Sequence, residues 1–221
     1  SKPWSTGRIT SLPVPARLLN HGSLAGFGRR LARPVDRWEK LADRVRAGFE
    51  RFWNEATGYC YDVLDGPEGH DGALRPNQIF AVSLPESPLS PERQRAVVDA
   101  CARHLLTPFG LRSLSPGHPQ YQGRYGGDQR ERDGAYHQGT VWAWLLGPFA
   151  LAHLRVYQDP AAAQPFLLPM AQHLGDYGVG SIAEIFDGDP PFTPRGCIAQ
   201  AWSVAETLRA GLEIEGGRVA P

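Results

Sequence analysis

The sequence predicts an all-α fold built from helical hairpins, and three observations support this prediction. Apolar residues recur at three- and four-residue steps in several long segments, the spacing of a helix with one buried face. Strong alternation of apolar and polar residues, which would indicate half-buried strands, does not occur. The segments also lack a strand–helix–strand order, and no GxGxxG, GxxxxGKS or GxxxxGKT string is present, which argues against nucleotide-binding folds.

Composition and charge limit the classes of partner. The 221 residues are 42% hydrophobic and 10% aromatic, which is enough for one substantial core. Lysine plus arginine and aspartate plus glutamate each number 23, so the zero formal charge gives no reason to expect a nucleic-acid partner. No stretch of about 18 uncharged apolar residues occurs, so we expect no membrane-spanning helix.

The three cysteines indicate a reducing compartment. Cys60, Cys101 and Cys197 lie far apart and match neither a metal-ligand spacing nor a paired redox motif. We therefore predict buried free thiols in a cytoplasmic protein, and we expect no metal and no organic cofactor.

The N-terminal half of the sequence divides into an arm and helices. Residues 1–35 have weak periodicity and scattered proline, glycine and arginine, which predicts an irregular arm before a folded part over 36–221. A helix is expected from Asp36 to about Asn54, with Asp36 as its N-cap in a capping box. Two more helices are expected over residues 77–84 and, behind the start signal of Ser90 and Pro91, over 90–106.

The C-terminal half alternates helices with two long loops. The loop over 107–135 is rich in glycine, proline and tyrosine, and loops of this length are usually functional or mobile. The helix over 138–156 is apolar nearly all round and is expected to be central and buried. A disturbed helix over 161–174 and a loop over 181–195 follow. The last helix is expected over 196–211, burying Ile198, Trp202, Ala205 and Leu208.

Polar and aromatic side chains gather at the ends of these helices, a pattern that suits a sugar-binding site. Aromatic rings stack on the apolar faces of pyranoses, and amide and guanidinium groups bind neighbouring hydroxyls through paired hydrogen bonds. Hydrolysis of a glycoside then needs two carboxyl groups, one protonated and one ionised. The candidates are Arg75, Asn77, Gln78, Asp133, Tyr136, His137, Gln138, Trp142, Glu184, Asp187 and Arg195.

Several candidates also have a purely structural explanation. Glu184 lies between isoleucines and a phenylalanine, an apolar setting suited to acid–base chemistry, but it could equally be an arginine-paired structural carboxylate. Asp133 precedes a glycine, so it could be a turn residue or a helix N-cap. Arg75 and Arg195 could be ordinary salt-bridge partners, and His137 fits a packing role better than a metal-ligand role.

Five segments together make the sequence similar to a known family. In chain order they resemble the C-terminal, glucosidase part of glycogen debranching enzymes, the amylo-α-1,6-glucosidases, over about residues 36–210. The resemblance implies a six-over-six α/α barrel, (α/α)6, of which this sequence would form the C-terminal half. It also implies hydrolysis of α-1,6-linked glucose at branch points of glycogen or limit dextrin, with inversion at the anomeric carbon. The segments are RFWNEATGYCYDVLDG from Arg51, LRPNQIFAVSLP from Leu74, LTPFGLRSLSP from Leu106, YHQGTVWAWLLGPF from Tyr136 and SIAEIFDGDPPFTPRGCIAQAWSVAE from Ser181.

The resemblance also assigns roles to the candidate residues. Glu184 matches the family's general base, which activates the attacking water. The segment with Arg75, Asn77 and Gln78 falls at the edge of the family's glucan pocket. The remaining sugar-contact candidates are Asp133, Tyr136, His137, Gln138 and Trp142, on a segment that lines the pocket, together with Asp187 and Arg195.

One departure from the family pattern concerns the general acid. The family acid is an aspartate in a Trp-Met-Asp segment upstream of the matched region, and this sequence contains no such segment. Asp133 is the replacement candidate, and without an acid we expect the chain alone to lose most of its rate.

A half-barrel would also expose apolar helix faces, so we expect self-association or an N-terminal complement chain. Two alternatives stay open: a non-catalytic carbohydrate-binding module, and a related α-glucosidase acting on a substrate such as trehalose.

Overall fold

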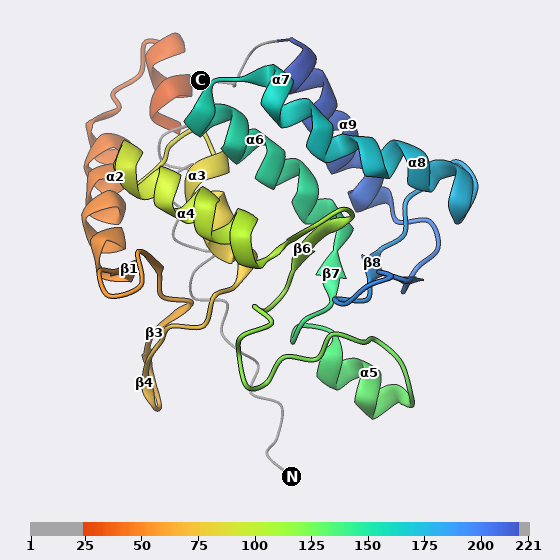
Figure 1. The fold of residues 1–221 in the computed structure, drawn as a ribbon. Coiled ribbons are helices and arrows are strands. Elements are labelled where there is room, and N and C mark those ends of the chain that lie inside the picture. Colours follow the sequence, from red (N-terminus) through yellow and green to blue (C-terminus); the bar gives the residue numbers. More distant parts are fainter. Residues whose placement is uncertain (1–23, 217–221) are drawn as a thin grey trace.

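The computed structural model describes residues 24–216, and helices are the main elements of this part of the chain. Most helices lie together at one end of the molecule, whereas the strands, α5 and the long loops lie at the other end (Figure 1). Four short 3-10 helices are η1 (Glu50–Phe52), η2 (Pro76–Ile79), η3 (Ala143–Leu145) and η4 (Gln164–Leu167). The labelled α-helices are α2 (Asp36–Phe49), α3 (Phe80–Ser83), α4 (Pro91–His104), α5 (Gln129–Ala135), α6 (Leu146–Tyr157), α7 (Pro160–Ala163), α8 (Leu168–Asp176) and α9 (Ala201–Glu215).

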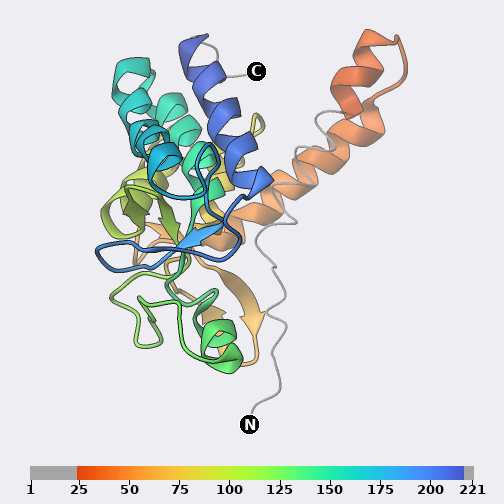
Figure 2. The ribbon, with the colours of Figure 1, turned by 90° about the vertical axis from the view of Figure 1, so that its right-hand side faces the viewer.

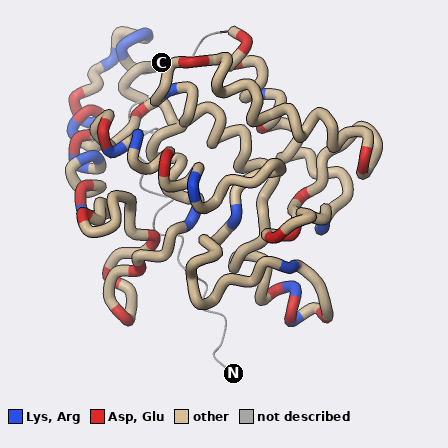
Figure 3. Tube along the Cα trace, in the orientation of Figure 1, with Lys and Arg blue, Asp and Glu red and all other residues tan. Residues whose placement is uncertain are grey.

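The N-terminal part of the described chain extends away from the other helices. Of the expected arm, residues 1–23 lie outside the described residues, and residues 24–30 are helical rather than irregular. Figure 2 shows this short helix and α2 projecting from the rest of the fold. Lysine, arginine, aspartate and glutamate crowd along these two helices, whereas α6 is almost free of them (Figure 3).

Helix α6 is the centre of the fold, as its apolar sequence predicts. It packs against α3, α4 and α9, and every residue from Leu146 to Ala152 is buried. Phe149 joins Val82 and Val97 in the largest apolar cluster of the described residues. Burial of a side chain of this size contributes about 1.5–3 kcal/mol, so this cluster holds the helices together.

The start of α6 differs from the prediction. The helix was expected from Gln138, but it begins at Leu146, after strand β7 and η3. Val141 and Trp142 form β7 because backbone groups of two neighbouring strands pair with them. A short, continuous apolar run fits a buried strand as well as a buried helix, so its periodicity could not separate the two.

A five-stranded antiparallel sheet joins the two long loops. Its strands are β5 to β9 in chain order, each paired with the next. Trp142 faces Ile185 and Val141 faces Phe186 across the antiparallel β7–β8 pair, which places Ala143 beside Glu184, and the backbone N–H of Ala143 donates to the Glu184 carbonyl. The strands are β5 (Leu106–Thr107), β6 (Gly110–Arg112), β7 (Val141–Trp142), β8 (Ile185–Phe186) and β9 (Pro194–Arg195); two separate hairpins pair β1 (Trp53–Asn54) with β2 (Tyr59–Cys60) and β3 (Val63–Gly66) with β4 (Gly69–Asp71).

The helix starts confirm one capping prediction and contradict another. The Ser90 hydroxyl accepts a hydrogen bond from the Arg93 N–H at 3.4 Å, and a proline fills the first turn of α4. At α2, by contrast, the N-cap is Val35 and Asp36 is already the first helical residue. The cap of α2 makes no side-chain hydrogen bond, so the expected capping box is absent there.

Helix α9 buries a different face from the one predicted. It packs small side chains such as Ser203 and Ala210 against α6, together with Ile214. The residues expected to be buried are exposed: Ile198, Trp202, Ala205 and Leu208. The apolar periodicity of this segment is real, but Ile198, Trp202 and Leu208 stay more than half exposed within residues 24–216, although the Trp202 ring stacks on Trp144.

The cysteine prediction holds in part. Cys60 and Cys101 are buried free thiols, whereas Cys197 is exposed. Cys197 is exposed because it lies in the loop before α9, whereas Cys60 lies in β2 and Cys101 in α4. Among residues 24–216, no helix is both long and apolar enough to cross a membrane.

Candidate active site

The Glu184 carboxylate is held from both sides immediately before strand β8. Its Oε1 atom accepts a hydrogen bond from the Tyr136 hydroxyl at 2.5 Å. Its Oε2 atom accepts one from the backbone N–H of Cys197 at 2.9 Å. The Glu184 backbone is fixed too, since its N–H donates to the carbonyl of Cys197 and its carbonyl accepts from Ala143. The carboxylate is therefore pre-set in one orientation with acceptor capacity left for a further donor, such as water.

Tyr136 lies in the loop between α5 and β7, among other rings. Burial and the neighbouring Glu184 carboxylate raise the pKa of the Tyr136 phenol well above its usual range. The phenol thus stays protonated and remains a donor at neutral pH. The Tyr136 ring meets Trp142 edge-on, with 4.6 Å between ring centroids, and the Trp142 indole N–H donates to the Tyr136 carbonyl.

His137 joins Tyr136 and Trp142 in an aromatic wall made of these three rings. Its ring lies parallel to Trp142, with centroids 5.3 Å apart. Partial burial and the positive charge of Arg75 lower the pKa of His137, so the ring is neutral near pH 7. The sheet therefore brings Tyr136, His137, Trp142 and Glu184 to one end of the fold.

Arg75 ties the Tyr136 loop to the start of η2. Its Nη1 atom donates to the carbonyls of Ser113 and His137, at 3.0 and 2.6 Å, and its Nη2 atom donates to Gln138 Oε1 at 2.8 Å. Its Nε atom lies 3.4 Å from Asp62 Oδ2. Asp62 was not among the predicted site residues. It lies in one of the family-like segments, but nothing in that segment distinguishes it from its polar neighbours.

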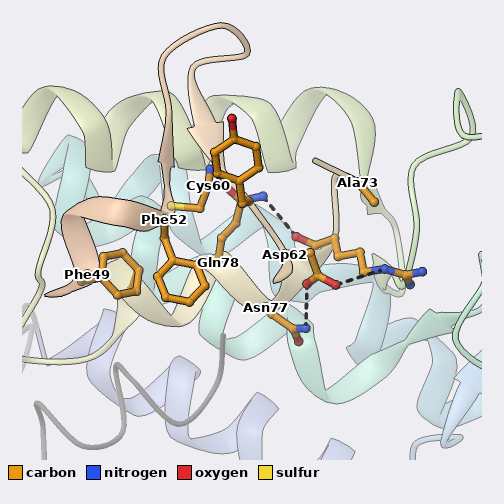
Figure 4. Close-up of a pocket in the computed structure, with 10 residues that line it drawn as sticks. Phe49, Phe52, Cys60, Asp62, Ala73, Asn77 and Gln78 are labelled. Carbon is orange, nitrogen blue, oxygen red and sulfur yellow. Dashed lines mark hydrogen bonds and ion pairs between the residues drawn. The ribbon is translucent and has the colours of Figure 1, made fainter. Parts of the chain in front are cut away.

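Asn77 and Gln78 contact protein atoms around a narrow pocket (Figure 4). Asn77 Nδ2 donates to Asp62 Oδ1 at 3.3 Å. Gln78 accepts from the Cys60 N–H and donates to the Arg75 carbonyl. The pocket has a volume of about 10 Å³, the space of a single water, so no sugar ring fits in it. Burial raises the pKa of Asp62, although Arg75 and Asn77 oppose that shift.

Asp187 and Arg195 form an ion pair across strands β8 and β9. Arg195 Nη2 donates to Asp187 Oδ2 at 3.0 Å, and Tyr125 donates its backbone N–H to Asp187 Oδ1 at 2.8 Å. Asp187 is only 6% exposed. The ion pair fixes the Asp187 carboxylate, and the hydrogen bond from Tyr125 to that carboxylate joins the loop over 181–195 to the loop over 107–135.

Asp133 lies apart from this network. It is exposed on α5, a helix that forms within the expected loop. The N-cap of α5 is Asp128, which forms a reciprocal capping box with Glu131. Asp133 is therefore not the cap, and the hydrogen bonds that hold the Glu184 carboxylate come from other residues.

A further residue that sequence reasoning missed supports the backbone beside Glu184. His173 on α8 is 3% exposed, and its Nε2 atom accepts a hydrogen bond from the backbone N–H of Ala183 at 3.3 Å. Its ring packs against Phe109 and Phe186. Burial lowers the pKa of His173, so the ring is neutral and can accept. A lone histidine in a helix carries no sequence signal for such a contact.

Acidification is expected to destabilise the fold through His173. Because its folded pKa is lowered, the unfolded chain binds the proton more readily, and stability falls as pH drops below the usual histidine value of about 6.5. We expect the free energy of unfolding, measured in urea, to fall from pH 7.5 to pH 5. His173→Gln keeps an acceptor and should reduce this dependence, whereas His104→Gln, at an exposed position, should not. Equal pH dependence in both variants would contradict the assignment.

The described residues contain no metal-binding group of three or more His, Cys, Asp or Glu side chains. The candidate site is thus a carboxylate beside an aromatic wall, with ion pairs behind it.

Comparison with known proteins decides the family. A family model described as amylo-alpha-1,6-glucosidase matches residues 23–209. The chain belongs to the amylo-α-1,6-glucosidase family. It is therefore part of a glycoside hydrolase family, as the five sequence segments predicted.

Individual relatives support this family and its fold. The chain is 31% identical over 93 residues to the glycogen debranching enzyme of Saccharomyces cerevisiae, a match that covers 39% of this chain and 6% of the yeast protein. It resembles the GH63 mannosylglycerate hydrolase of Thermus thermophilus with a TM-score of 0.69 and 16% identity, over 90% of this chain and 46% of that one. For the neutral trehalase of S. cerevisiae the TM-score is 0.57 at 14% identity, over 94% and 39% of the two chains.

The chain thus spans less than half the length of these relatives. Its neighbours confirm the predicted fold class, part of an (α/α)6 barrel. The short strands are an addition to that prediction, because they connect helices without altering the helical architecture.

Proposed function

We propose that this chain carries the general-base part of an inverting α-1,6-glucosidase site, acting on branch points of glycogen or limit dextrin. The observation that carries the proposal is the Glu184 carboxylate, fixed between the Tyr136 hydroxyl and the Cys197 N–H. An inverting enzyme needs an ionised carboxylate that removes a proton from water on one face of the sugar. Two donors hold the carboxylate oxygens in one orientation and leave acceptor capacity for the attacking water.

The aromatic wall supplies a surface for the sugar ring. Tyr136, His137 and Trp142 contact one another beside Glu184. Such rings offer apolar faces to the C–H groups of a pyranose and polar edges to its hydroxyls. His137 is exposed, and Tyr136 and Trp142 are half-buried, so the wall is accessible to a ligand.

The general acid must lie across the sugar from the base, about 6.5–9.5 Å away in an inverting pair. Asp133 is the replacement candidate that the sequence offers, but it is exposed on α5, and the hydrogen bonds to the Glu184 carboxylate come from other residues. We therefore propose that polypeptide outside the described residues supplies the acid, and that the chain alone is incomplete as a catalyst. We also propose a cytoplasmic location, in keeping with its free thiols.

The experiment that tests the proposal measures glucose release from phosphorylase-limit dextrin and from trehalose, with the chain alone and with an added N-terminal half of a family member. Release from limit dextrin but not trehalose, strongest with the added half, is the expected result. Glucose release from trehalose but not from limit dextrin would contradict the proposal and indicate a related α-glucosidase. Binding of limit dextrin without hydrolysis under both conditions would instead identify a carbohydrate-binding module.

The exposed stripe of α9, formed by Trp202, Leu208 and Leu212, is proposed to dock such an N-terminal complement. These three side chains are 51%, 62% and 71% exposed. Structural relatives contain this fold within chains more than twice as long as the matched part, so further barrel helices are the natural cover for the stripe.

Without its complement, the chain is expected to self-associate through this stripe. Light scattering should give a mass above that of one chain, and Leu208→Glu should return it to one chain because a charge cannot be buried in an apolar contact. Leu168→Glu, which adds the same charge at an exposed leucine of α8 instead of α9, is the control and should change nothing. A wild-type monomer at all concentrations would contradict this expectation.

A further inference from the structure

The Asp62–Arg75 pair lies behind the candidate site and not in a sugar-sized cavity. We propose that Arg75, anchored by Asp62, is a positioning residue for the Glu184 carboxylate and acts through the loop that carries Tyr136. The inference rests on the proposed function only for the role of Glu184 as base. It assigns to Arg75 a contact with the protein in place of the sugar contact that its sequence suggested.

The donors of Arg75 are directed at the protein. Three hydrogen bonds reach Ser113, His137 and Gln138, and the remaining edge of the guanidinium faces Asp62. The Arg75 side chain is 18% exposed. A guanidinium used in this way has little donor capacity left for sugar hydroxyls.

Asp62 fixes the other side of the guanidinium. Its side chain is 14% exposed, and it accepts a hydrogen bond from Asn77 in addition to the contact with Arg75. Its backbone N–H donates to the carbonyl of Asp71, which ties it to the β3–β4 hairpin. A half-buried carboxylate with two partners is a fixed anchor, because losing either partner would leave a poorly solvated charge.

The path from Arg75 to the carboxylate is short. Arg75 holds the carbonyl of His137 and the side chain of Gln138, the two residues directly after Tyr136. The Tyr136 hydroxyl in turn donates to Glu184. The carbonyl of Gln138 also accepts from the Gln122 N–H, so the loop is held on both sides. A shift of the loop would therefore move the Tyr136 hydroxyl relative to Glu184.

Lysine cannot replace arginine in this network. A guanidinium presents five N–H groups in a fixed plane, and here they reach acceptors on three separate residues as well as a carboxylate. An ammonium group keeps the charge but is a point donor on a flexible stem. Arg75→Lys thus tests the geometry of the bridge with the charge retained.

The experiment reads Tyr136 directly, by fluorine NMR of protein grown with fluorotyrosine. Tyr136→Phe assigns the resonance, and Glu184→Gln defines the shift caused by altering its partner. Arg75→Lys and the milder Asp62→Asn are expected to move the Tyr136 resonance. Arg155→Lys is the matched control, since Arg155 also donates to backbone carbonyls, those of Leu84 and Pro85, but not to this loop.

Kinetics on limit dextrin, with the complement present, separate positioning from sugar binding. A misplacement of about 1 Å can cost about 10²-fold in rate, so Arg75→Lys should lower kcat by up to that factor with little change in KM. A raised KM with unchanged kcat and an unmoved Tyr136 resonance would overturn the proposal in favour of a sugar contact. If Arg75→Lys does not fold, Asp62→Asn and Gln138→Ala give the same readout.

The two proposals fail separately. The NMR shift needs no turnover, so it tests the position of Tyr136 even in a chain without activity. If Glu184→Gln leaves hydrolysis unchanged while Arg75→Lys still moves the Tyr136 resonance, the base assignment is wrong and the link between Arg75 and Tyr136 stands. An unmoved resonance in Arg75→Lys and Asp62→Asn overturns the link, whatever the activity.

Discussion

With the N-terminal complement present, Glu184→Gln is expected to lower glucose release from limit dextrin by about 10²–10⁴-fold, the usual contribution of a general base or acid. The glutamine keeps the shape of the side chain, since its oxygen can accept from the Cys197 N–H while its amide group donates to the Tyr136 hydroxyl oxygen. It cannot take a proton from water. Binding of limit dextrin and the free energy of unfolding should therefore change little, the latter by about 1 kcal/mol at most.

Glu206→Gln is the matched control for this substitution. Glu206 is a partly exposed glutamate on α9, paired with Arg209 three residues later in the same helix. Such a pair contributes about 0.2–0.5 kcal/mol, so the control should hydrolyse limit dextrin at the wild-type rate. A rate in Glu184→Gln equal to that of Glu206→Gln would exclude Glu184 as the base.

Gly139→Ala is expected to have the largest effect on stability. Gly139 lies between the Tyr136 loop and β7 with φ +142°, a conformation that L side chains rarely adopt. A Cβ there would lie 2.3 Å from the carbonyl oxygen of Gln122, and backbone cannot swing aside as a side chain can. Backbone strain alone costs about 1–3 kcal/mol, so we expect a total loss above about 3 kcal/mol in urea unfolding, or no folded protein.

Gly134→Ala provides the comparison for Gly139→Ala. Gly134 lies within α5, and a Cβ there would meet nothing within 4 Å. Alanine in a helix is favoured over glycine by about 0.5–1 kcal/mol, so this variant should be as stable as the wild type or more so. Similar stability in the two variants would contradict the prediction. It would show that a side chain is tolerated at position 139, beside the carbonyl of Gln122.

Local signals in the sequence predicted the long helices well. Ser90 with Pro91 gave the start of α4 because capping depends on a few adjacent residues. The apolar run of α6 gave its central place because a helix without a polar face has to be buried. The same logic misplaced the buried face of α9, since periodicity shows that Trp202 and Leu208 are apolar positions of one helix but not what covers them.

The candidate site was only partly predictable. Glu184 and Tyr136 could be picked out as chemically suitable, but their contact joins residues 48 positions apart. The strands that bring them together are two or three residues long, too short to show any alternation. The sequence did not single out Asp62, because its role depends on its contact with Arg75, 13 residues later, and the sequence does not show that contact.

By itself, the sequence determined the family, the helical class and the location of the polar clusters, because each depends on residues close together along the chain. Only the tertiary structure decided which carboxylate is held by which donor, how Arg75 distributes its hydrogen bonds and which face of α9 stays exposed. Hydrogen bonds and packing across a sheet depend on distances between remote residues, and no local pattern encodes those distances.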